Sequence, residues 1–121
     1  MTVLEDFLYW VLGMQEDDPL PYEINYIYFL ISFSNNACTL VYAGSENFEK
    51  QPVNFEYFPL EAQYFYNQTF NQITEINLAL LALKQLLEDS FDNPEFKKMF
   101  KNKKIYFGEF AKSVTIFDNN I

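Results

Sequence analysis

The stretch from Pro59 to Ser90 constrains this chain most, because it runs for about thirty residues without an internal glycine or proline. Apolar side chains recur in it at alternating steps of three and four, the spacing of one helical face; they are Ile73, Ile76, Leu80, Leu83 and Leu87. The pattern predicts one long helix of roughly 45 Å. No residue from Leu78 to Leu83 is polar, so this part is expected to be covered on more than one side. Because a small sheet cannot shelter so long a helix, part of it is expected to meet a partner.

The first helix is expected to begin with a capping box, in which the Thr2 hydroxyl accepts a hydrogen bond from the Glu5 backbone. The apolar stripe that follows consists of Leu4, Phe7, Leu8, Val11 and Met14, and Gly13 with the acidic and proline residues at 17–21 is expected to end the helix. Tyr9 and Trp10 lie outside the stripe. They either cover the rim of a sheet or anchor a partner.

Three strands are expected next, over residues 22–33, 38–43 and 53–58, because β-branched and aromatic residues or a two-residue alternation dominate there. Asn35 and Asn36 supply a hairpin turn, since asparagine tolerates positive φ. After the long helix, Asn93 is expected to cap a second helix with Pro94 in its first position. Strands over 105–110 and 114–117 complete the prediction.

This order, α-β-β-β-α-α-β-β, predicts a single α+β domain over residues 1–121. Hairpin connections dominate, which favours two layers: a mostly antiparallel sheet of about five strands packed against the long helix. The layout resembles that of small acidic chaperones that hold secretion effectors. The resemblance implies a homodimeric adaptor.

The charge is strongly negative and unevenly placed. The formal net charge is −9, and residues 1–58 carry nine acidic residues against Lys50 alone. Such a surface disfavours nucleic acid and anionic membranes. It attracts a basic protein partner and speeds the encounter, although acidity can also serve solubility alone.

Few residue types for catalysis are present. The chain has no His or Arg, which excludes serine triads and Cys–His dyads. Cys38 lies in a predicted strand without an adjacent cation and is interpreted as an inert buried thiol. The cluster Glu16, Asp17 and Asp18 lacks the spacing and the glycine of a calcium loop. No catalytic, metal or cofactor residue is assigned.

The lysines between 97 and 104 alternate with aromatic residues, which is superficially typical of a nucleic-acid platform. Phe96, Met99 and Phe100 are spaced as a core-facing stripe, however, so the lysines are interpreted as the polar side of a helix terminus. A single cysteine and an amino terminus without a basic region indicate the cytoplasm. Abundant Asn, Phe and Lys without Arg suits a bacterial or phage genome.

The sequence therefore favours a non-enzymatic acidic protein-binding domain: an immunity or antitoxin protein, or a phage-encoded inhibitor of a basic partner. The expected partner-binding residues are Tyr9, Trp10, Glu16, Asp17, Asp18, Glu46 and Glu49. The first alternative is the homodimeric adaptor, pairing through Leu78–Leu83 or Tyr9–Trp10. The second alternative is a hydrolase that depends on carboxylates.

Overall fold

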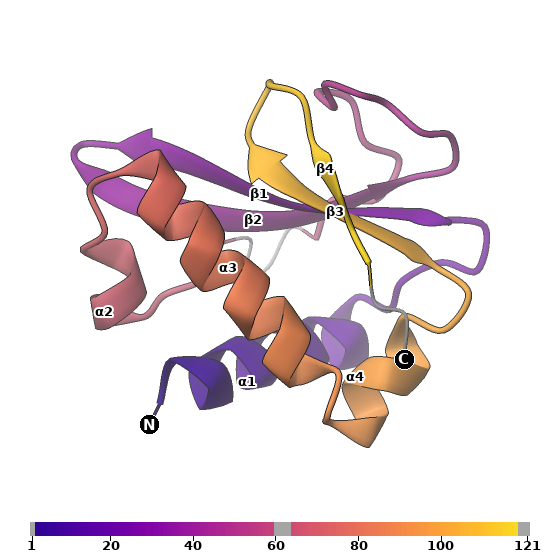
Figure 1. Ribbon diagram of the computed structural model, residues 1–121. Helices are drawn as coiled ribbons and strands as arrows, with labels where there is room; N and C mark the ends of the chain where they lie inside the picture. The colour runs from indigo at the N-terminus through magenta and orange to yellow at the C-terminus, as the bar shows by residue number, and fades with distance from the viewer. Residues whose placement is uncertain (1, 60–63, 119–121) are drawn as a thin grey trace.

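The computed structural model describes residues 2–59 and 64–118, which form an α+β fold around a four-stranded sheet. The elements follow in this order: α1 (Val3–Asp17), β1 (Tyr26–Ser34), β2 (Ala37–Ser45), α2 (Gln68–Asn71), α3 (Ile76–Ser90), α4 (Pro94–Met99), β3 (Lys104–Glu109) and β4 (Thr115–Phe117). Helices α1, α3 and α4 lie together on one side of the sheet, and the loop that follows β2 lies on the other side (Figure 1).

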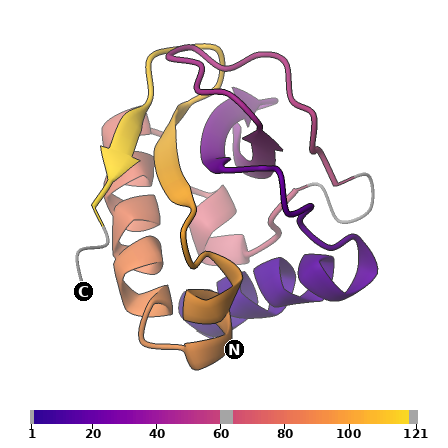
Figure 2. The same cartoon turned by 90° about the vertical axis from the view of Figure 1, so that its right-hand side faces the viewer.

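The sheet is mostly antiparallel, as the sequence predicts, and its strand order is β2-β1-β3-β4. The β1–β2 hairpin is confirmed: Asn35 and Asn36 have φ of 52° and 64°, and Phe33 pairs with Cys38. β3 pairs antiparallel with β4 but parallel with β1. The parallel pairing follows from the α3–α4 crossover, which returns the chain to the starting end of β1. The Figure 2 view shows both helices of this crossover beside β3.

The prediction of a third strand over residues 53–58 is wrong. Only Tyr57 makes a bridge there, with Gly44 of β2. The rest of the segment is irregular and crosses the second face of the sheet, where Phe55 and Phe58 pack around the buried residues Tyr28, Leu30 and Val41. The alternation at 53–58 therefore does not mark a strand: Val53 is 50% exposed, and Phe55 and Tyr57 pack in two different clusters. The sheet has four strands instead of about five.

The prediction of a single long helix from Pro59 to Ser90 is also wrong. α3 covers only Ile76–Ser90, roughly 22 Å, and the part of the prediction at 60–63 lies outside the described residues. Residues 64–67 are extended instead of helical, because Phe65 N–H donates to the Leu40 carbonyl of β2. The Asn67 side chain then caps the short α2 by accepting from Phe70 N–H. Hydrogen bonds to the sheet and to side chains replace those that a continuous helix would need.

The expected coverage of the apolar run from Leu78 to Leu83 needs correction. Ala79, Leu83 and Leu87 of α3 are buried as expected, but Leu78 and Leu81 are 54% and 65% exposed. The fold therefore covers only one side of the apolar run at 78–83.

The α1 capping box is confirmed, with Glu5 N–H donating to Thr2 Oγ1 and Thr2 N–H donating to Glu5 Oε1. The helix passes through Gly13 and ends at Asp17 with Asp18 as its cap, so the expected end at residues 17–21 is confirmed and Gly13 has no part in it. The α4 cap is confirmed too: Asn93 Oδ1 accepts from Glu95 and Phe96 N–H, and Pro94 is the first helical residue.

Aromatic side chains dominate the core between the sheet and the helices. Phe7 of α1 lies 5.7 Å from both Phe29 of β1 and Phe65, measured between ring centroids. Phe96 and Phe100 of α4 complete the cluster, with their ring centroids 4.8 Å apart. This core fixes α1 with one face against the sheet and leaves its other face to solvent. No helix within residues 2–59 and 64–118 combines the length and the apolar character needed to cross a membrane.

Candidate protein-binding surface

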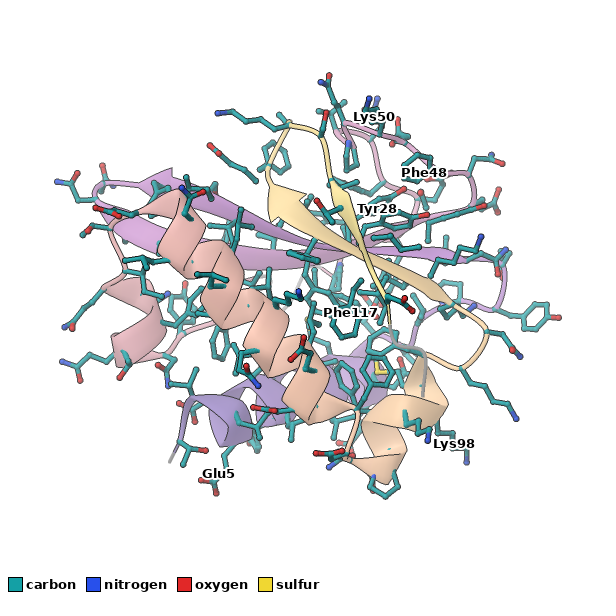
Figure 3. The ribbon with its side chains drawn as sticks, viewed as in Figure 1. Glu5, Tyr28, Phe48, Lys50, Lys98 and Phe117 are labelled. Atoms are coloured by element: carbon teal, nitrogen blue, oxygen red, sulfur yellow. The ribbon has the colours of Figure 1, made fainter. Side chains whose placement is uncertain are left out.

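The exposed side of α1 borders a broad, open depression of about 1490 Å³, which we name the α1 depression. Its walls come from α1, from the extended residues 64–66 and from α4. Six carboxylates line it against one cation, Lys98: Glu5, Asp6, Glu16, Asp17, Asp18 and Glu95. Figure 3 shows Glu5 and Lys98 on the helical side of the molecule, and Phe48 and Lys50 on the opposite side.

The helical period of α1 decides which side chains reach this surface. Phe7, Trp10, Val11 and Met14 face the core and are buried. The opposite face therefore carries residues displaced by steps of three or four, namely Glu5, Tyr9, Gly13 and Glu16. Tyr9 is 78% exposed.

The extended segment at 64–67 forms the second wall. Phe65 points inward and packs against Trp10 of α1, with 5.4 Å between ring centroids. Because successive side chains of an extended chain point to opposite sides, Tyr64 and Tyr66 turn outward, and Tyr66 is 77% exposed. Asn67 Nδ2 donates to Asp6 Oδ2 over 2.8 Å and holds this segment beside α1.

The carboxyl end of α1 carries charge of the sign that the helix dipole disfavours. Glu16, Asp17 and Asp18 are exposed there, and the last turn has no basic residue. Between two described residues the structure shows one salt bridge, Lys112–Glu109, so it supplies no ion pair to these three side chains. Each acidic group at this position costs about 0.3–1 kcal/mol of helix stability. A bound cation would remove that cost.

Two buried tyrosines underlie this acidic end. Tyr57 Oη donates to the backbone carbonyl of Asp18 over 2.7 Å, which ties the loop after β2 to α1. Burial raises the pKa of Tyr57 well above its ordinary value, and the negative charge of Asp18 raises it further. Burial also raises the pKa of Tyr42, with the neighbouring Tyr57 as the next cause. Both hydroxyls therefore remain neutral at physiological pH.

The structure brings together five of the seven partner-binding residues predicted from the sequence. Tyr9, Trp10, Glu16, Asp17 and Asp18 all line the α1 depression. The expectation that Trp10 lies outside the apolar stripe of α1 is wrong: it is buried with Phe7, Val11 and Met14. It is only 8% exposed and packs on Tyr42 of β2 and on Phe65, so it supports the floor of the depression.

Glu46 and Glu49 are not part of this surface, because they follow β2 on the loop that covers the other face of the sheet. Glu49 N–H donates to Tyr28 Oη over 3.0 Å, and Glu46 N–H contacts Glu56 Oε1 at 3.4 Å. The acidic first half of the chain therefore splits between two faces of the molecule.

Sequence reasoning missed part of the surface. It did not assign Glu5, Asp6 or Glu95, and it placed Tyr64 and Tyr66 inside a helix. The run Tyr64-Phe65-Tyr66 consists of residues that favour extended chain, which was the available signal.

The cysteine and the lysine cluster at 97–104, which the sequence also offered as candidates, show no sign of a reactive site. Cys38 is fully buried, and this burial raises the pKa of its thiol to about 11. Phe96 and Phe100 are buried beneath the lysine cluster, whose Lys103 donates from Nζ to the Tyr22 carbonyl. In the part of the chain that the structure describes, no three side chains of the His, Cys, Asp and Glu types gather as metal ligands would.

Comparisons with protein-family models, with curated proteins and with solved structures found no match to this chain.

Proposed function

We propose that this protein is a non-enzymatic binding protein that sequesters a basic protein partner through the α1 depression, in the manner of an immunity protein, an antitoxin or a phage-encoded inhibitor. The observation that carries the proposal is the composition of the depression, six carboxylates beside exposed tyrosines with Lys98 as the one cation. Carboxylates steer and orient a cationic partner, and tyrosines supply rigid contact area at low entropic cost.

The unpaired carboxylates at the end of α1 support this proposal further. Glu16, Asp17 and Asp18 weaken the helix that carries them, and no described cation compensates. α3 also ends on acidic residues, Glu88 and Asp89, without a basic residue in its last turn. What sets the end of α1 apart is that its carboxylates line the depression together with exposed tyrosines.

Two triple variants of equal charge test the proposal. The first, Glu16→Gln/Asp17→Asn/Asp18→Asn, neutralises the end of α1. The control, Glu46→Gln/Glu88→Gln/Asp92→Asn, removes three charges at exposed residues outside the depression. Immobilised wild type and control are expected to retain the same discrete cationic protein from a lysate of the source cell at low salt and to release it as NaCl rises.

The α1 variant is expected to lose that protein. If both triple variants lose it equally, net charge alone is responsible and the depression is not the site. If wild type retains no discrete cationic protein, the proposed function is wrong.

The homodimeric adaptor remains a second candidate because of one observation: Leu78 and Leu81 of α3 stand exposed one helical turn apart. Such a pair can pack against its symmetry mate in a dimer. Light scattering over a range of concentrations decides this candidate. A dimer that Leu78→Glu/Leu81→Glu converts to monomer supports it, and a wild-type monomer at high concentration removes it.

A further inference from the structure

We propose that the partner crosses α1 at Gly13 and places an arginine side chain there, between the ring of Tyr9 and the carboxylates of Glu16 and Asp17. This inference rests on the proposed function and adds the position of the contact and the chemical class of the side chain that makes it.

The absence of a side chain at Gly13 locates the contact. This residue lies in the interior of α1, where glycine stabilises a helix less than alanine does. Its φ is not positive, so the backbone does not require glycine. Apart from its chain neighbours and the backbone of its own helix, a Cβ added to Gly13 would meet no atom of the described residues within 4 Å. Neither backbone conformation nor described packing explains the missing side chain.

The neighbours of Gly13 define what the bare position accommodates. Tyr9 precedes it by one helical turn, and Glu16 and Asp17 follow it by about one turn. The Cβ atoms of Tyr9 on one side, and of Glu16 and Asp17 on the other, are therefore each about one helical turn, roughly 5–6 Å, from Gly13. All three side chains are exposed. The absence of a Cβ lets such a group lie close to the helix backbone.

Guanidinium is the cation that matches these two neighbours. Its planar group stacks on an aromatic face and at the same time offers a fork of N–H donors to a carboxylate. The ammonium of lysine forms a point contact without the fork. The chain itself contains no arginine, so this side chain has to come from another molecule.

The test compares nona-arginine with nonalysine as probes, because the two peptides carry equal charge. Trp10 is the one tryptophan in the chain and lies under the depression, so its fluorescence reports binding. Wild type is expected to bind nona-arginine several-fold more tightly than nonalysine.

Gly13→Ala is expected to weaken nona-arginine binding by about fivefold or more, because the added methyl group occupies the contact. It is also expected to raise the melting temperature by about 3 °C, because alanine favours the helix. The control Asn77→Ala raises helix propensity on α3, away from the depression, and is expected to leave binding unchanged.

Each other result decides against a stated part of the argument. If Gly13→Ala binds nona-arginine as wild type does, or if nonalysine binds equally well, the inference is overturned while the proposed function stands. A lower melting temperature of Gly13→Ala would show that the protein's own atoms need the space, which also overturns it. If wild type binds neither peptide, both the inference and the basic-partner proposal lose their support.

Discussion

At the scale of single residues, Tyr42 and Tyr57 show how differently two neighbouring buried hydroxyls are placed. Their rings meet edge to face with 5.6 Å between centroids. Tyr57 Oη donates to the Asp18 carbonyl, whereas Tyr42 Oη approaches the Tyr57 hydroxyl but makes no hydrogen bond of ordinary geometry to a described residue. A buried hydroxyl without a partner costs folding free energy, and a paired one contributes about 0.5–1.5 kcal/mol.

Replacing each tyrosine with phenylalanine tests this difference. Tyr57→Phe is expected to lower the free energy of unfolding by about 1 kcal/mol, because it removes the tie between the loop and α1. Tyr42→Phe serves as the matched control and is expected to be neutral or stabilising, because it removes an unpaired polar atom. Urea unfolding followed by Trp10 fluorescence measures both values. An equal loss in Tyr42→Phe would mean that its hydroxyl has a partner.

At the scale of elements, local signals in the sequence predicted those parts of the fold that local interactions decide. The Thr2 and Asn93 caps and the turn at Asn35 and Asn36 each need side chains only a few residues apart. The parallel pairing of β1 with β3 joins segments far apart in the chain, and no local pattern encodes it.

The candidate site divides in the same way. The helical period of α1 is local, so Tyr9 and the carboxylates at 16–18 could be predicted. The opposite wall was missed, because the position of Tyr64 and Tyr66 depends on backbone hydrogen bonds from their segment to β2, which is far away in the sequence. Asparagine favours caps and turns over helix interiors, so Asn67 and Asn71 were the available evidence that the helix breaks there.

Asn71 provides the test at this scale, because its side chain holds the segment at 64–71 on the sheet. Asn71 Nδ2 donates to the carbonyls of Cys38 and Phe65, and Oδ1 accepts from Asn67 N–H. Asn71→Ala is expected to lower the free energy of unfolding by about 2–3 kcal/mol, because three hydrogen bonds are lost together. The adjacent exposed Gln72 gives the control, and Gln72→Ala is expected to stay within about 0.5 kcal/mol of wild type. Thermal unfolding that places both variants at the same stability would disprove this role for Asn71.

At the scale of the whole molecule, negative charge opposes folding and favours a basic partner at the same time. The net charge is −9, and the ion pair seen between described residues, Lys112–Glu109, is a surface pair of little energetic value. Screening therefore relieves self-repulsion and loses almost no favourable attraction within the chain. The same screening weakens any complex that depends on the carboxylates of the α1 depression.

Salt is thus expected to change stability and binding in opposite directions. As NaCl rises from about 0.01 M to about 0.15 M, the Debye length falls from about 30 Å to about 8 Å, and the melting temperature of the free protein is expected to rise by a few degrees. Over the same range the affinity for nona-arginine is expected to fall by at least tenfold, because several charge contacts are screened together. Differential scanning calorimetry and Trp10 fluorescence titration in matched buffers measure the two quantities. If the melting temperature fell with salt, attraction between charges within the chain would outweigh repulsion. The acidic residues would then stabilise the free protein, and this would contradict the view that they destabilise it and are compensated by a basic partner.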